Sequence, residues 1–123
     1  MDKPILQPGP DHPITVTPTG SRVTVKVGDQ VLADTTAALT LQESNYPAVQ
    51  YVPLADVDQT MISPTDTETY CPYKGDASYY SIGDDRALVD AIWTYRKPYE
   101  AVADIADHVA FYPDRVTIEV AGA

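Results

Sequence analysis

Apolar and polar residues alternate along most of the chain with the two-residue period of a β-strand. Residues 22–27 alternate strictly, with valines on one face, and residues 14–16 form a shorter run of the same kind. The Gly-Asp pair at 28–29 predicts a hairpin leading to a further strand at 30–33. Thr and Val dominate these segments, and β-branched side chains suit a pleated, half-buried surface. The first part of the domain is therefore predicted to be antiparallel sheet.

The β pattern continues to the end of the chain with one long interruption. Further strands are predicted at residues 37–43, 49–53, 70–71, 77–82, 87–95, 109–112 and 116–120. The last two are predicted to pair as a hairpin. Residues 54–68 hold acids, threonines and a proline, which predicts a long surface loop with one short helical turn.

One helix is predicted, over residues 98–107. Pro98 fits the first turn, and apolar residues at i, i+3 and i+4 from Val102 form a stripe. Residues 1–13 are Pro-rich and without periodicity, which predicts an extended N-terminal arm before a single domain over 14–123. Sequential strands with short turns and one helix in the C-terminal half predict a mainly β domain, a barrel or a sandwich.

Composition and charge exclude several classes of function. The net charge is −10, from 18 acidic and 8 scattered basic residues, so nucleic acid is not an expected partner. We expect no membrane partner, because no apolar run approaches 18 residues. The single cysteine, Cys71, cannot form a disulfide within the chain, which favours a cytoplasmic location. With His12 and His108 as the only histidines, we expect neither a structural zinc site nor another cofactor.

Candidate chemistry concentrates where the aromatic residues gather. Residues 70–80 combine a thiol, an ammonium group, a glycine and four tyrosines, and most other aromatic residues lie in 91–95 and 109–112. Such side chains either fill a core or line a small-molecule pocket, and the sequence leaves both open. The candidate pocket residues are Arg22, Glu43, Tyr51, Asp56, Cys71, Tyr73, Lys74, Trp93, Tyr95 and Tyr112.

A structural interpretation also exists for four residues, Cys71, His12, His108 and Arg22. Cys71 is either a small buried hydrophobe or a nucleophile activated by Lys74 or His108. His12 either packs against the first sheet or is exposed, and His108 is expected to cap the end of the predicted helix. Arg22 could also pair with Glu43 or Asp56 for purely structural reasons.

Four motifs in order resemble the domain of unknown function 427 family. They are Tyr51-x-Pro53-x-x-Asp56-Val57, Thr69-x-Cys71-Pro72-Tyr73-Lys74-Gly75-x-Ala77-x-Tyr79, Trp93-x-Tyr95-x-x-Pro98 and Ala110-Phe111-Tyr112-Pro113. The resemblance covers nearly the whole chain, from about Ile14 to Val120. The polar candidates Arg22, Glu43, Tyr51, Asp56 and Lys74 also match the family's pattern.

The resemblance implies small antiparallel sheets in a β-tent-like arrangement, similar to methionine sulfoxide reductase B and the thalidomide-binding domain of cereblon. Many members of that wider fold hold zinc with two Cys-x-x-Cys pairs, whereas this chain has one cysteine, so no metal is expected. The family is sometimes catalogued as nucleotidyltransferase-like. Gly20-Ser21 and Asp56-Val57-Asp58 match that chemistry only as short, distant fragments, so the label is not adopted.

The sequence is compatible with three functions. The first is binding of a small molecule in an aromatic-lined cleft, with Arg22 and Lys74 for an anionic group and Glu43 or Asp56 opposite. The second is an enzyme of unknown reaction that uses Cys71 or a carboxylate such as Asp56. The third is a protein-interaction domain that uses an edge strand, as a monomer or homodimer.

Overall fold

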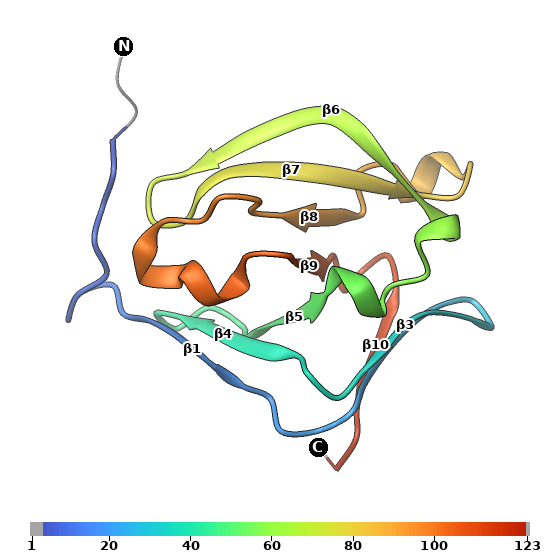
Figure 1. Ribbon diagram of the computed structural model, residues 1–123, viewed down its shortest axis with the longest axis horizontal. Helices are drawn as coiled ribbons and strands as arrows, with labels where there is room; N and C mark the ends of the chain where they lie inside the picture. The colour runs from blue at the N-terminus through green and yellow to red at the C-terminus, as the bar shows by residue number, and fades with distance from the viewer. Residues whose placement is uncertain (1–3, 123) are drawn as a thin grey trace.

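The computed structural model describes residues 4–122, whose strands form two antiparallel sheets. In spatial order the larger sheet contains β1 (Ile14–Pro18), β4 (Leu39–Glu43), β5 (Val49–Pro53), β9 (His108–Phe111), β8 (Ile92–Thr94), β7 (Gly75–Ile82) and β6 (Ile62–Cys71) (Figure 1). The smaller sheet contains β10 (Thr117–Val120), β2 (Val23–Val27) and β3 (Gln30–Thr35). The predicted mainly β fold is confirmed, and the two described sheets stay open rather than closing into a barrel.

The alternation along the strands divides the apolar residues between two cores. One core lies between the two sheets, where Val23 and Val25 of β2 meet Val52, Ile92 and Val109 of the larger sheet. The neighbouring residues on those strands point to the opposite face, because successive side chains of a strand alternate. That second face carries the other core, which contains most of the aromatic residues.

The predicted helix over 98–107 is wrong in type and length. The segment forms only 3-10 turns, η4 (Glu100–Ile105), and Val102 has non-helical backbone angles that kink it. No side chain caps its first turn, and an uncapped segment this short gains little from helix propagation. Its apolar stripe is nevertheless used, because Val102 and Ile105 are buried in the second core. No helix within residues 4–122 is long and apolar enough to cross a membrane.

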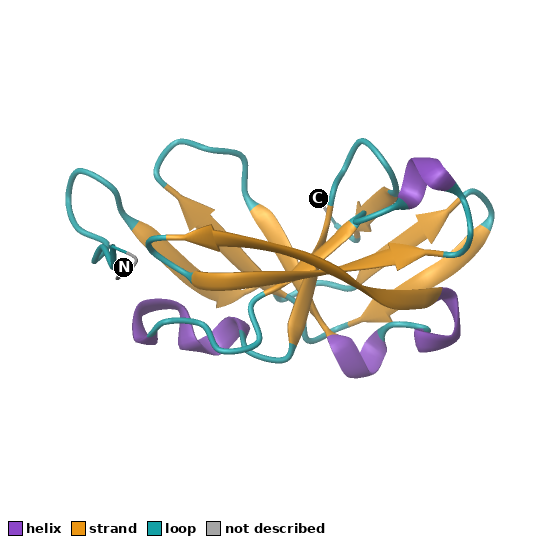
Figure 2. Ribbon diagram, turned by 90° about the horizontal axis from the view of Figure 1, so that it is seen from above, coloured by secondary structure: helices purple, strands orange, loops and turns teal. Residues whose placement is uncertain are grey.

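Residues 54–68 are not the predicted loop. They contain two 3-10 turns, η1 (Leu54–Asp56) and η2 (Gln59–Met61), and then most of β6. The polar composition misled the prediction because β6 is an edge strand, where one side of the backbone needs no partner. Pro64 and the irregular pairing between it and Glu68 interrupt the ladder to β7. These features disfavour pairing of this edge with another molecule. Seen from above, the long strands β6 and β7 cross and twist strongly (Figure 2).

Two further strand predictions need correction. The predicted hairpin near the C-terminus does not form, because β9 pairs with β5 and β8 while β10 pairs with β2 in the other sheet. The predicted strand over 87–95 is shortened to β8 and preceded by a 3-10 turn, η3 (Arg86–Leu88). Asp90 has a positive φ of 54°, which ends any extended run before Ile92. The predicted hairpin of β2 and β3 is confirmed.

Gly75, the first residue of β7, should tolerate replacement less well than the other glycines. Its φ is +112°, and an added Cβ would lie 3.4 Å from the carbonyl oxygen of Lys97. Gly75→Ala should lower the free energy of unfolding, measured with urea, by about 2–3 kcal/mol through backbone strain. Gly20→Ala is the matched control, since its φ is +76° and nothing lies within 4 Å of an added Cβ. An equal loss in both variants would show that the φ of +112° at Gly75 costs no more than the φ of +76° at Gly20.

Candidate functional site

Three neighbouring strands, β7, β8 and β9, present two aromatic residues and an alanine on the same face of the larger sheet. Tyr79 of β7 lies opposite Trp93 of β8, which in turn lies opposite Ala110 of β9. The small Ala110 leaves space beside the indole ring, and the Tyr112 ring lies 4.7 Å from that of Trp93, centroid to centroid. Tyr51 of β5 meets the indole ring edge-on at 6.4 Å. The second core therefore opens into a hollow with aromatic walls.

This hollow, which we name the aromatic pocket, has a volume of about 240 Å³. Its walls come from β4, β5, β7 and β8 and from the turns next to them. The lining residues are Leu41, Glu43, Tyr46, Pro47, Val49, Tyr51, Lys74, Tyr79, Trp93, Tyr95 and Tyr112. The pocket thus combines six aromatic side chains with one acid and one base.

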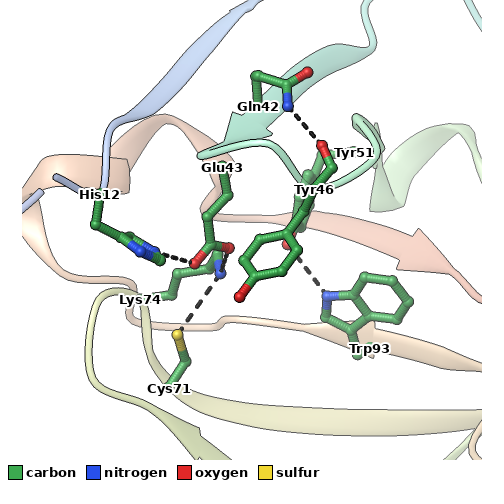
Figure 3. Close-up of polar contacts among 8 residues, drawn as sticks. All are labelled: His12, Gln42, Glu43, Tyr46, Tyr51, Cys71, Lys74 and Trp93. Atoms are coloured by element: carbon green, nitrogen blue, oxygen red, sulfur yellow. Dashed lines mark hydrogen bonds and ion pairs between the residues drawn. The ribbon is translucent and has the colours of Figure 1, made fainter. Parts of the chain in front are cut away.

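The acid and the base form an ion pair at the end of the pocket (Figure 3). Lys74 Nζ donates to Glu43 Oε1 at 2.5 Å, and only 8% of Lys74 is exposed. Lys74 lies in the tight turn between β6 and β7, where its N–H donates to the Cys71 carbonyl at 3.2 Å. Burial alone would raise the pKa of Glu43, but hydrogen bonds from Lys74 and His12 lower it below its ordinary value. Glu43 is therefore a carboxylate at neutral pH.

The N-terminal arm supplies a third member of this cluster. His12 Nε2 lies 2.7 Å from Glu43 Oε2, and the imidazole ring stacks on Tyr73 at 4.1 Å. Backbone hydrogen bonds hold the arm in place, from Leu6 N–H to the Pro72 carbonyl and from the Ser44 N–H to the Pro13 carbonyl. Of the two sequence interpretations of His12, packing against the domain is the one that the structure shows.

Burial controls the protonation of the tyrosines in the pocket. It raises the pKa of Tyr51, an effect that the hydrogen bond from Trp93 Nε1 at 3.2 Å only partly offsets. Burial also raises the pKa of Tyr95. Burial, followed by a hydrogen bond with Tyr79, raises the pKa of Tyr112 to about 12. At neutral pH these phenols are uncharged and can donate hydrogen bonds.

The structure brings most of the predicted pocket residues together. The six that line the aromatic pocket are Glu43, Tyr51, Lys74, Trp93, Tyr95 and Tyr112. Cys71 and Tyr73 lie just behind it, with Cys71 Sγ 3.6 Å from Lys74 Nζ.

Two predicted residues lie elsewhere. Arg22 is exposed and forms a bidentate pair with Asp34, so it does not line the pocket. Asp56 accepts a hydrogen bond from the Thr35 hydroxyl at 2.7 Å, and Asp58 caps η2 by accepting from Thr60. Asp58 therefore caps its own turn, whereas Asp56 links η1 to β3. Within residues 4–122, no three His, Cys, Asp or Glu side chains converge as a metal site requires.

Several pocket residues were missing from the sequence prediction. Tyr79 could have been found, since it shares its strand face with Ala77 and falls inside the densest aromatic segment. Tyr46 and Pro47 lie in the turn between β4 and β5, where no periodic signal exists. Gln42 fixes that turn by donating to the Tyr46 carbonyl at 2.6 Å (Figure 3). His108 is not a helix cap but begins β9, with Nδ1 2.8 Å from the Ala106 carbonyl.

Glu43 should make stability depend on pH in the acid range. Because its pKa is lowered in the folded state, its contribution is complete above the ordinary glutamate pKa of about 4.3 and is lost as pH falls through the lower folded value. Glu43→Gln should cost about 1–2 kcal/mol in urea unfolding at neutral pH, since solvent screens a half-buried pair. The difference from the wild type should shrink below about pH 4. Glu119→Gln, which breaks the exposed pair with Lys26, is the control with a smaller loss. A Glu43→Gln deficit that stays constant with pH would be incompatible with this assignment.

Comparisons with known proteins agree with the sequence motifs. A search of curated proteins finds no match to the chain. The family model of the domain of unknown function DUF427 matches residues 15–122. Apart from Ile14 at the start of β1, that span contains both sheets, and it contains every residue that lines the aromatic pocket. The chain belongs to the domain of unknown function 427 family.

Proposed function

We propose that this domain binds a small, uncharged, planar organic molecule in the aromatic pocket. The observation that carries the proposal is the convergence of six aromatic side chains and a buried Lys74–Glu43 pair around one hollow of about 240 Å³. Concave sites with apolar walls and a few placed polar groups are the usual form of small-molecule sites. The pocket has both components.

The walls favour a flat molecule. Trp93 and Tyr112 are tilted at 51° to each other, and Tyr51 meets Trp93 at 89°, so faces and edges of several rings are presented. Planar rings pack well against such surfaces, in offset or edge-to-face arrangements. Tyr46, at the rim, is 59% exposed and can cover an occupant from the solvent side.

The charges of the pocket favour a neutral molecule over an anion. Lys74 is balanced by Glu43, and Arg22, the other base expected here, lies on the surface with Asp34. An unpaired charge brought into a buried site carries a large desolvation cost. The net charge of −10 further disfavours the approach of anions. An anionic ligand therefore has less support than it had from the sequence.

Neutral hydroxyl and ammonium groups can orient the occupant. Tyr51 and Tyr95 keep their phenolic protons, since burial raises the pKa of each, and Lys74 has one N–H beyond those directed at Glu43 and Cys71. A carbonyl, amide or ester oxygen on the molecule can accept from these donors. The enzyme alternative has weaker support, because Asp56 lies with Thr35 and Cys71 is behind the pocket wall.

Small planar probes should bind to the aromatic pocket in solution. Phenol, indole, benzamide and methyl 4-hydroxybenzoate at millimolar concentration should shift the amide NMR signals of the pocket strands, with the Trp93 indole N–H among the largest. The chain has one tryptophan, whose indole N–H donates to Tyr51 of the pocket, so this signal is unambiguous and lies at the pocket wall. Shifts confined to other surfaces, or no shifts with any of the four probes, would overturn the proposed function.

The charge preference should change when the ion pair is broken. The wild type should bind methyl 4-hydroxybenzoate at least tenfold more tightly than the 4-hydroxybenzoate anion, measured by calorimetry. Glu43→Gln leaves Lys74 unpaired, so this ratio should fall roughly tenfold, as expected for one nearby charge partly screened by solvent.

The control for this charge change is Asp34→Asn. It removes one negative charge from the exposed pair with Arg22, away from the pocket, and so changes the net charge equally. Its ratio should match that of the wild type. A wild type that prefers the anion, or equal changes in the two variants, would show that the Lys74–Glu43 pair does not set the preference.

A further inference from the structure

A second hollow adjoins the aromatic pocket and shares part of its wall. We name this hollow of about 310 Å³ the apolar annex. Pro47, Val49 and Trp93 line both spaces, so the indole ring and the start of β5 are common to them. The annex is thus adjacent to the proposed ligand site, and these three residues form the wall between the two spaces.

The annex arises where the larger sheet comes apart. β5 and β9 are paired only through Val52 with Val109 and Pro53 with His108. The beginning of β5 and the end of β9 have no ladder between them, and Gln50 and Phe111 line the opening from its two sides. The smaller sheet supplies another wall, since Ile118 and Val120 of β10 also face this space.

The walls of the annex are apolar. Ala48, Phe111, Pro113, Ile118 and Val120 line it in addition to the three shared residues, and none of the described lining residues is charged. Its one amide side chain, that of Gln50, is occupied by Thr40, to which it donates at 3.1 Å. A space of this kind favours hydrocarbon and offers little to a charged or strongly polar group.

From this adjacency and the apolar lining of the annex we infer that the molecule bound in the aromatic pocket carries an apolar tail that passes Trp93 and lies in the apolar annex. The inference rests on the proposed function and adds the class of ligand: an amphipathic molecule with a planar polar head and a flexible hydrocarbon chain. The head meets Lys74, Tyr51 and Tyr95, and the tail meets Ile118 and Val120. The annex volume of about 310 Å³ accommodates a chain of several methylene groups.

A series of esters with one head and growing tails tests the inference. Methyl, propyl and pentyl 4-hydroxybenzoate should bind with dissociation constants that fall about two- to fourfold per added methylene, measured by calorimetry. In the pentyl complex, nuclear Overhauser effects should connect the tail protons to the methyl groups of Ile118 and Val120.

Two substitutions place a phenylalanine in the annex. Neither replaces a residue that lines the aromatic pocket. Val120→Phe narrows it from β10, and Ala48→Phe does so from an exposed turn, where a larger side chain leaves the core intact. In both variants the increase in affinity with tail length should be mostly lost, while the affinity for the methyl ester should equal that of the wild type. Thr117→Phe adds the same ring at an exposed position of β10 that does not line the annex, and should keep the gain.

The outcomes separate the two proposals. If no ester binds, the proposed function and this inference both fall. If the methyl ester binds in the aromatic pocket but the tail adds nothing, or if the gain survives in both annex variants, the proposed function stands and the tail site is overturned. Overhauser contacts from the tail to residues outside the annex would overturn it equally.

Discussion

The buried ion pair between Lys74 and Glu43 is the interaction on which the site depends. It joins the turn between β6 and β7 to the end of β4, which lie in opposite halves of the larger sheet. Leaving either charge buried alone would be costly, so each fixes the position of the other. Through His12 the same carboxylate also orders the N-terminal arm. The pair therefore closes one end of the aromatic pocket, and its two opposite charges leave the pocket with almost no net charge.

The pairing of the strands explains why the larger sheet has hollows beside the Lys74–Glu43 pair. In a continuous sheet β5 would pair with β9 along its whole length, but only two residue pairs connect these strands. The unpaired length leaves one hollow on the aromatic face and another toward β10, with Trp93 between them. Incomplete pairing at the centre of the sheet, rather than a surface loop, thus creates the proposed ligand site.

Period-two alternation was enough to predict the β class, the β2–β3 hairpin and most of β4, β5 and β7, because it reflects local burial. It failed at β6, whose polar edge hides the pattern. It did predict β9 and β10 as strands, but their predicted pairing was wrong, because these consecutive strands join different sheets. The aromatic walls were predictable from dense segments that include Trp93. The partner of Arg22 was not, since the register of β2 and β3, which pairs Asp34 with Thr24, brings the Asp34 side chain within reach of Arg22. Strand pairing and register, which the sequence encodes weakly, decided both cases.

The most direct measurement is a crystal structure of the protein with benzamide bound. The account predicts benzamide density inside the aromatic pocket, with its ring against Trp93 and its carbonyl oxygen accepting from Lys74, Tyr51 or Tyr95, while Lys74 still contacts Glu43. Benzamide found only at other surfaces, or a Lys74 side chain turned to solvent with Glu43 unpaired, would contradict it.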